Sequence, residues 1–247
     1  HRDAIATMLA ELVTAGIDTS AFTAVGHRVV QGASLFTHSV RIDESVAEGI
    51  ESLIPLAPLH NHAHVLGIRA MMDALPEVPN VAVFDTAFHS TMPAHAYTYA
   101  IEKNVAAKYG VRRYGFHGSS HRYVARRAAE MLGVAPDKIN VIVCHLGIGA
   151  SVSAVQNGGC VDTSMGLTPL EGLVMGTRSG DIDPSIIFHL AREAKLNIAE
   201  LDALLRHMAT QPALTIESEY VELFDRGRRT ALHLFEHVHG DSRDRGP

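Results

Sequence analysis

The chain has 247 residues, enough for one large or two small domains, and its 47% hydrophobic and 19% charged residues are typical of a folded globular protein. A net charge of -6 argues against a nucleic-acid or anionic-membrane binder, but it is compatible with a local basic pocket for a small anion. No apolar run is long enough to span a bilayer, and Cys144 and Cys160 suit a reducing compartment, so we expect a cytoplasmic protein.

The chain begins with a helix-like pattern followed by a strand-like one. Apolar residues recur at helical spacing up to Gly16 and predict an opening helix that faces the core. Residues 23–30 then predict a strand, with Arg28 near its end. A second helix is expected over residues 45–53.

A third helix and a buried strand follow. Prolines 55 and 58 end the second helix, and the third is expected to run through Leu75. The apolar residues 81–84 predict a short strand that delivers Asp85 at its C-terminal end. In open α/β sheets that edge is where ligands bind.

The second half of the chain also mixes the two patterns. Helices are predicted over 97–108 and 119–132, and a continuous apolar strand over 139–144. That strand leads into a glycine loop at 145–151, and residues 151–163 predict a hairpin that turns at Asn-Gly-Gly.

Beyond Pro184 the pattern is helical, and the tail after His239 is polar and is expected to be unstructured. No repeat of solenoid length is present. The sequence therefore predicts a mixed α/β protein.

Residues 176–184 place Arg178 among small residues and follow it with Asp181 and Asp183. A planar, permanently charged guanidinium suits phosphate or carboxylate oxygens, and the two carboxylates could orient the arginine or a hydrated metal. The alternative is a surface turn with an ordinary salt bridge. With Asp85 and the glycine loop, this segment is expected to outline a cleft.

The glycine loop, residues 145–151, could aim backbone N–H groups at phosphate oxygens, because glycines remove the side chains that would block the approach. It lacks the Gly-Lys-Ser/Thr signature of a P-loop, and a tight hairpin is the alternative.

His117 precedes the helix predicted over 119–132, where Ser119 or Ser120 could cap the first turn. From this loop the histidine could donate a hydrogen bond to a transferring phosphoryl group. Most of the 16 histidines must be structural, so its glycine neighbour and its place beside the cleft are what favour it.

His60, His62 and His64 suggest a different function, because three imidazoles at short spacing can bind zinc in a metallohydrolase, with Asp85 as a further ligand. If a helix begins near Asn61, side chains two residues apart diverge and the three cannot converge.

Six motifs together resemble the acetate kinase (acetokinase) family of the actin-like and sugar-kinase ATPase superfamily, in the same order and over nearly the whole chain. The motifs are HRVV at 27–30, APLHN at 57–61, FDTAFH with TMP at 84–93, RYGFHG at 113–118, DTSMG at 162–166 and GTRSGDIDP at 176–184.

The resemblance implies a two-domain, actin-like (ribonuclease-H-like) α/β architecture that is incomplete at both termini. Residues 1–87 would form part of a substrate-side domain and residues 88–247 part of a nucleotide-side domain. The implied enzyme is a phosphotransferase with a carboxyl acceptor. It uses Mg²⁺ to transfer a phosphoryl group between ATP and acetate or propionate, giving acetyl phosphate and ADP. The family is homodimeric.

The resemblance also implies residue roles. Arg28 would bind the substrate, Arg178 and His117 would stabilise the transition state, and Asp85 matches the carboxylate usually given as the active-site acid/base. We interpret Asp85 as an orienter of arginine or metal, because acetate offers no proton to remove. The apolar pocket for the substrate methyl group would comprise Val30, Leu59, Phe116 and Pro169, with His60 beside it. The nucleotide side would use His145, Leu146, Gly147, Ile148 and Gly149.

The chain departs from the family pattern in several places. The N-terminal phosphate and metal turn, the late adenosine loop and a C-terminal magnesium-binding glutamate have no counterpart, and residues 208–216 lack the expected glycines. Ile148, Gln31, Ala33 and His62 stand where the family has asparagine, histidine, glycine and proline. The alternative is therefore a truncated or degenerate relative that binds small anions without turnover.

Overall fold

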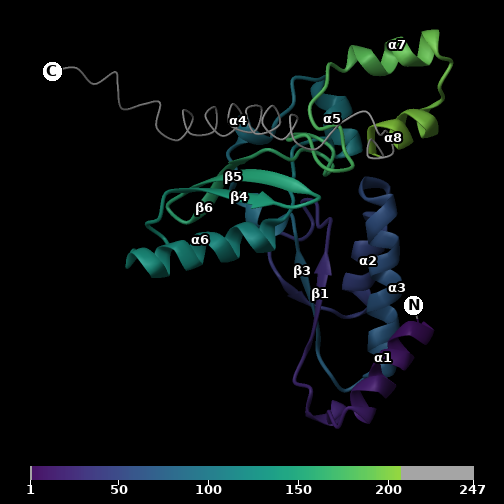
Figure 1. The fold of residues 1–247 in the computed structure, drawn as a ribbon, viewed down its shortest axis with the longest axis vertical. Helices are drawn as coiled ribbons and strands as arrows, with labels where there is room; N and C mark the ends of the chain where they lie inside the picture. The colour runs from purple at the N-terminus through teal and green to yellow at the C-terminus, as the bar shows by residue number, and fades with distance from the viewer. Residues whose placement is uncertain (1, 207–247) are drawn as a thin grey trace. The chain divides into compact units, whose positions relative to one another are not determined.

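The computed structural model describes residues 2–206, apart from the side chain of Leu59. Two compact units make up the chain, one ending at Ser90 and the other beginning at Thr91 (Figure 1). The predicted substrate-side and nucleotide-side domains, 1–87 and 88–247, stay a prediction. The expectations for residues 208–216 and for the tail lie outside the described residues.

The first unit is a small mixed sheet with helices. Its elements are α1 (Arg2–Thr14), η1 (Thr19–Ala21), β1 (Val25–Val29), β2 (Val40–Arg41), α2 (Glu44–Ser52), η2 (Ile54–Leu56), α3 (Pro58–Ala74) and β3 (Asn80–Phe84), and the 3-10 helix η3 (Ala87–Thr91) leads out of it. The strand order is β1-β3-β2, in which β1 is parallel and β2 antiparallel to β3. Since Arg28 pairs in register with Val83, the two parallel strands end at the same edge.

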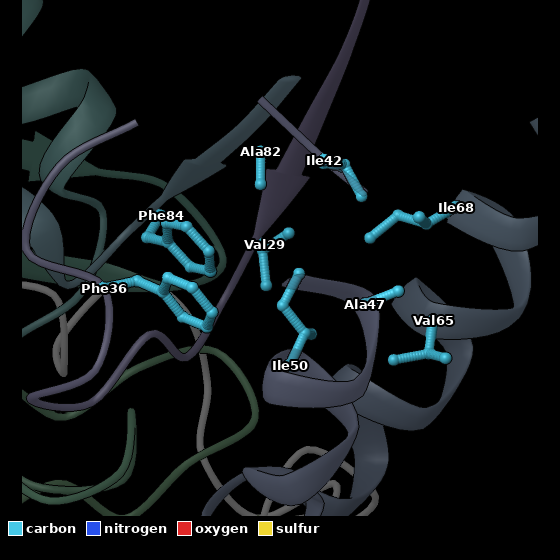
Figure 2. Close-up of a cluster of buried hydrophobic side chains, with 9 residues drawn as sticks. All are labelled: Val29, Phe36, Ile42, Ala47, Ile50, Val65, Ile68, Ala82 and Phe84. Atoms are coloured by element: carbon cyan, nitrogen blue, oxygen red, sulfur yellow. The ribbon is translucent and has the colours of Figure 1, made fainter. Parts of the chain in front are cut away.

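One hydrophobic cluster fills the space between this sheet and helices α2 and α3 (Figure 2). The rings of Phe36 and Phe84 stack with their centroids 4.7 Å apart and their planes 4° from parallel. Val29 and Phe84, the last residues of β1 and β3, are 0% and 1% exposed. Full burial of such side chains contributes about 1.5–3 kcal/mol each, so the strand ends that precede the candidate site are firmly anchored.

The predicted helices of this unit are confirmed, with one difference. α1 packs against α3, but none of its residues is buried, and Ile5, Leu9 and Leu12 are half-buried. It is therefore a peripheral helix, not the core-facing one expected. α2 begins after Asp43, whose side chain accepts a hydrogen bond from the N–H of Val46.

The second unit contains an antiparallel meander. Its elements are α4 (Ala94–Tyr97), α5 (Lys103–Tyr109), α6 (Gly118–Leu132), β4 (Val141–Leu146), β5 (Ala150–Gln156), β6 (Gly159–Thr163), α7 (Ser185–Glu193) and α8 (Ile198–Arg206). The strand order is β4-β5-β6, and α6 packs against β4. The predicted hairpin is confirmed, because Asn157 and Gly158 adopt φ of +50° and +75° between β5 and β6.

Two expectations for this unit are wrong in detail. The helix predicted over 97–108 starts only at Lys103, because the Glu102 side chain accepts hydrogen bonds from the N–H groups of Asn104 and Val105 and so begins the helix there. The glycine loop is shorter than residues 145–151, since its first two residues belong to β4 and its last two to β5, paired across the turn. It is the tight hairpin of the alternative interpretation.

None of the described helices is both long and apolar enough to cross a membrane.

Candidate functional site

In the first unit, Arg28 on β1 forms a two-pronged ion pair with Asp85, which follows β3. Arg28 Nε donates to Asp85 Oδ1 at 2.9 Å, and Nη2 donates to Oδ2 at 2.6 Å. The Asp85 side chain is 1% exposed, whereas that of Arg28 is 62% exposed. The hydrogen bonds to Asp85 raise the pKa of Arg28. Asp85 therefore orients the arginine, whose Nη1 side remains available to an anion.

Helix α3 is tied to the end of β1 by polar side chains. The N–H of Val30 donates to His64 Nδ1 at 3.5 Å, and Asn61 Nδ2 donates to the carbonyl of Gln31 at 3.0 Å. Burial, followed by the neighbouring His60 and Arg28, lowers the pKa of His64. The sequence hypotheses gave His64 no place beside Arg28, although its helical spacing from His60 was a usable signal.

The histidine cluster lies on one helix, because α3 begins at Pro58. The rings of His60 and His64 are 6.4 Å apart, and His62 lies between them in the sequence on a diverging direction. Within residues 2–206, no group of three or more His, Cys, Asp or Glu side chains could hold a metal ion. The zinc hypothesis therefore gains no support.

In the second unit, His117 occupies the N-cap position of α6 with a left-handed backbone, φ +58°. Its Nδ1 lies 2.8 Å from Ser151 Oγ on β5, and its ring stacks on that of His145 with centroids 4.0 Å apart. His145 is held in turn by Ser120, whose Oγ is 2.8 Å from Nδ1. Ser120 thus positions a histidine and does not cap the helix as expected.

Arg178 is held by uncharged atoms. Its Nη1 donates to the carbonyl oxygen of Pro169 at 3.1 Å and contacts Met175 Sδ at 3.5 Å. Burial, with a smaller effect of Arg206, lowers the pKa of Arg178. Among residues 2–206, no carboxylate forms an ion pair with this guanidinium.

The two aspartates that follow Arg178 have other partners. Asp181 Oδ1 accepts a hydrogen bond from the N–H of Gly172 at 2.7 Å, and Asp183 Oδ1 accepts one from the N–H of Ser185 at 2.8 Å. They brace the loop and the start of α7. The idea that they orient Arg178 is therefore wrong for this structure.

His117 and Arg178 converge on Gly149, in the turn between β4 and β5. A Cβ atom on Gly149 would lie 3.5 Å from Arg178 Nη1 and 3.5 Å from His117 Nε2. The turn and the arginine loop are joined, because the N–H of Gly176 donates to the carbonyl of Ile148 at 3.1 Å. A small space beside Gly149 is thus flanked by one cation and one imidazole edge.

The remaining predicted site residues take various positions within their own units. Val30 and Phe116 are almost fully buried, whereas Pro169 is half-buried and holds Arg178. Leu59 lies in the first turn of α3, and its side chain is outside the described part. Leu146 at the end of β4 and Ile148 in the turn are strongly exposed, and Gly147 is the first residue of the turn.

An ionic network supports the segment that carries Pro169. Arg113 Nη2 donates to Glu171 Oε1 at 2.8 Å, and the Tyr99 hydroxyl donates to the other oxygen of Glu171. Burial and the hydrogen bond to Glu171 raise the pKa of Tyr99. The carbonyl that holds Arg178 is therefore set by a partly buried ionic network.

Known proteins resemble this chain over most of its length. It is 56% identical over 207 residues to the acetate kinase of Streptomyces coelicolor. The aligned region covers 83% of this chain and 51% of that protein. Identity to the Thermotoga maritima acetate kinase is 54% over 209 residues, covering 83% of this chain and 52% of that protein. The chain thus spans about half the length of the curated relatives it matches.

Solved structures agree. A propionate kinase from Francisella tularensis superposes with a TM-score of 0.81 at 46% identity, covering 85% of this chain and 54% of that one. The acetate kinase of Entamoeba histolytica gives a TM-score of 0.77 at 33% identity, covering 100% and 59%. The mixed α/β chain therefore has the actin-like ATPase fold of these kinases, of which it covers about half. Residues 1–227 match the model of the acetokinase family, and the chain belongs to that family.

Proposed function

We propose that this chain transfers a phosphoryl group between ATP and the carboxylate of acetate or a similarly short acid such as propionate, giving an acyl phosphate and ADP. The observation that carries the proposal is the convergence of Arg178 Nη1 and His117 Nε2 on the space beside Gly149. The family membership of the chain supports the choice of reaction.

The reaction needs no base. A carboxylate oxygen forms a bond to the γ-phosphorus while the bond from phosphorus to the β–γ bridging oxygen breaks, and that electron pair leaves with ADP. Because nucleophile and phosphate are both anionic, catalysis has to overcome their repulsion and stabilise charge on the equatorial oxygens. Donors that are fixed before the substrate arrives do this best.

Each proposed role follows from a contact. Arg178 and the Nε2 edge of His117 would bind the equatorial oxygens, because both face the same space. Arg28 would bind the substrate carboxylate with the side that Asp85 leaves available. Asp85 acts on the arginine and not on a proton, since both of its oxygens already accept hydrogen bonds from Arg28.

The apolar residues predicted for the acyl tail keep that role as a proposal. They are Val30, Leu59, Phe116 and Pro169, with His60 beside them. A hydrophobic pocket separates substrates that differ by one methylene by about 10–200-fold, so acetate and propionate are both expected to react.

The nucleotide phosphates are proposed to lie against the turn formed by His145 to Gly149. Magnesium usually enters such sites with the phosphates and one or two carboxylates. Asp85 is engaged by Arg28, and residues 2–206 contain no group of three or more acidic, histidine or cysteine side chains fit to hold a metal ion. The described residues alone therefore do not make a resident Mg²⁺ site, and we assign no step to the metal. A cytoplasmic homodimer is the state proposed from the family.

Acetyl phosphate formation from acetate and MgATP, measured as its hydroxamate, tests the proposal on the 247-residue chain. We expect ATP-dependent product that falls by about 10³-fold in Arg178→Ala, the effect typical of losing one transition-state donor. Arg127→Ala is the matched control, because Arg127 forms a surface pair with Glu130 on α6 and should leave the rate unchanged.

A folded chain that forms no product, in either direction of the reaction, would overturn the kinase proposal. Binding of inorganic phosphate by such an inactive chain, measured by calorimetry and lost in Arg178→Ala, would instead establish the degenerate anion-binding relative. Stoichiometric zinc in the purified chain, together with hydrolase activity lost in His60→Ala, would revive the metallohydrolase.

A further inference from the structure

Ser151 joins two histidines, only one of which faces the proposed reaction space. Its Oγ lies 2.8 Å from Nδ1 of His117 and 2.8 Å from Nε2 of His121. Ser151 and His121 are both 0% exposed. His121 follows one turn after His117 on α6. The contacts thus form a hydrogen-bonded relay, His121–Ser151–His117, that runs from the buried core to the ring edge that faces Gly149.

The proton count along this chain is restricted. A serine hydroxyl carries one proton and can donate it to only one of the two imidazoles, so at least one histidine must donate to Ser151. In a neutral imidazole one ring nitrogen is a donor and the other an acceptor. The tautomers of His117 and His121 are therefore coupled through the hydroxyl.

The proposed chemistry selects one arrangement. To donate to a phosphoryl oxygen beside Gly149, neutral His117 must carry its proton on Nε2, which makes Nδ1 an acceptor. Ser151 must then donate to His117, and His121 must donate to Ser151 through its own Nε2–H. If His117 instead donated to Ser151 through Nδ1–H, it could also donate through Nε2 only as a cation. Arg178 disfavours that cation by like-charge repulsion, because both groups face the same point.

The charge of Arg178 gives the Ser151–His121 relay a functional purpose. A neighbouring cation attracts a lone pair, so in the absence of ligand its field would favour an unprotonated Nε2 on His117. That tautomer could not donate to phosphate. We propose that His121, acting through Ser151, is the positioning residue that holds the proton of His117 on Nε2 against the field of Arg178. This inference rests on the proposed function for its purpose, but not for its test.

Nitrogen-15 NMR of the histidine rings in the full 247-residue chain reports the tautomers directly, through the pattern of couplings between ring protons and each nitrogen. At pH 8 neutral imidazoles dominate. We expect the His117 signals, assigned by their loss in His117→Asn, to show the Nε2–H form, and His121 to show the Nε2–H form as well. A wild-type His117 found with its proton on Nδ1, or a His121 whose Nε2 is unprotonated, would overturn the proposal.

Variants extend the test. Ser151→Ala should shift His117 toward the Nδ1–H tautomer, whereas His121→Gln keeps an N–H donor near the hydroxyl and should preserve the Nε2–H form. His121→Leu removes the donor to Ser151 but leaves the hydroxyl able to donate or accept, so it should shift His117 toward the Nδ1–H tautomer less than Ser151→Ala does. An Nε2–H tautomer that persists unchanged in a folded Ser151→Ala chain would contradict the relay.

The NMR result and turnover separate the two proposals. If the chain makes acetyl phosphate, Ser151→Ala should lower kcat about 10-fold with little change in the KM for acetate, and His121→Gln should recover most of the loss. If tautomers follow the expectation and no product forms, the kinase proposal fails while the relay stands.

Discussion

The two arginines predicted to have functional roles, one in each unit, are held in opposite ways. Arg28 makes two hydrogen bonds to a carboxylate that is 1% exposed, so its charge is compensated within the protein. Arg178 is held by the carbonyl of Pro169 and the sulfur of Met175, and no carboxylate among residues 2–206 pairs with it. The same residue type therefore forms a structural ion pair in the first unit, whereas in the second unit it pairs with no described carboxylate.

Under the proposed function, this difference would let one residue type serve two steps. A compensated arginine is oriented but binds a further anion only moderately, which suits a substrate that must arrive and leave. An uncompensated one is costly to bury and gains most when a strongly charged anion meets it. Under the proposed function, the larger electrostatic effect is therefore expected at the space beside Gly149, which Arg178 Nη1 faces.

The largest expected effect is on activity, and it follows from a substitution that fills the space beside Gly149. Gly149→Ala would add a methyl group 3.5 Å from both Arg178 Nη1 and His117 Nε2, a normal van der Waals distance. The backbone of Gly149 does not have the positive φ that penalises alanine. We therefore expect an intact fold and a 10²–10³-fold lower rate of acetyl phosphate formation, since a methyl group would replace the phosphoryl oxygen.

Gly67→Ala is the control for this change, because Gly67 lies in α3 with no atom within 4 Å of the added Cβ. It should leave the rate unchanged and stabilise the helix by about 0.5–1 kcal/mol. If Gly149→Ala keeps more than a third of the activity, the two side chains do not act on that space and the contrast between the arginines loses its functional meaning.

The next effect is on stability. Arg28→Ala leaves the Asp85 carboxylate buried without its two donors, so we expect the free energy of unfolding to fall by about 2–3 kcal/mol, less than for a fully buried pair because Arg28 is partly solvated. Arg178→Ala removes a charge that pairs with no carboxylate among residues 2–206, and it should change the free energy of unfolding by less than about 1 kcal/mol. Urea unfolding monitored by circular dichroism measures both.

A second substitution tests the cause. Adding Asp85→Asn to Arg28→Ala removes the orphaned charge and should restore part of the lost stability, whereas adding it to Arg178→Ala should not. Equal losses in Arg28→Ala and Arg178→Ala would show that the ion pair contributes little and would remove the contrast between the two units.

The sequence predicted the secondary-structure positions of the site residues better than it predicted their contacts. Strand patterns placed Arg28 and Asp85 each at a strand end, because period and burial are local signals, and the structure shows that these two strands are neighbours. The partners of Arg178 could not be read in this way. Asp181 and Asp183 were the nearest carboxylates in sequence, yet loop geometry turns them toward Gly172 and Ser185.

The histidine chain shows the same limit. His117 was found through its motif, but the link from His117 to His121 passes through Ser151, which lies on another element and is brought there by the pairing of β4 with β5. Similarly, the capping carboxylate of Glu102 was missed, and with it the start of α5. Contacts between distant residues depend on tertiary packing, which no local pattern contains.

A smaller effect concerns pH. The pKa of His64 is lowered by burial and by neighbouring His60 and Arg28, so the folded chain favours the neutral ring. The unfolded chain binds the proton more readily, so this stability is present above about pH 6.5 and is lost as the pH falls below it. We expect His64→Asn, which keeps an acceptor for the N–H of Val30, to reduce the acid-induced loss of stability.

Unfolding measured between pH 7.5 and 5.5 checks this, with the exposed His62→Asn on the same helix as the control. No difference between wild type and His64→Asn would mean that neither burial nor the neighbouring charges, including that of Arg28 beside Asp85, disfavour the protonated ring. That outcome would itself sharpen the contrast with Arg178, whose field no carboxylate among residues 2–206 offsets.

The smallest expected change in stability comes from backbone strain, which can be compared in the two units. Ala33, in the turn after β1, has φ of +48°, and His117, beside Arg178, has φ of +58°. Such backbone costs a residue with a Cβ about 1–2 kcal/mol; glycine removes this strain, but it loses more conformational entropy on folding, which offsets part of the gain. Ala33→Gly should therefore stabilise the chain by about 0.5 kcal/mol without changing the rate, since the N–H of Ala33 can still donate to Gln31 Oε1. His117→Gly should relieve the same strain, but it also removes the ring that contacts Ser151 and stacks on His145, so we expect no net gain in stability together with the loss of most of the activity. If His117→Gly leaves the activity intact, the His117 ring does not act at the space beside Gly149, and the left-handed backbone that carries it is as incidental to function as that at Ala33.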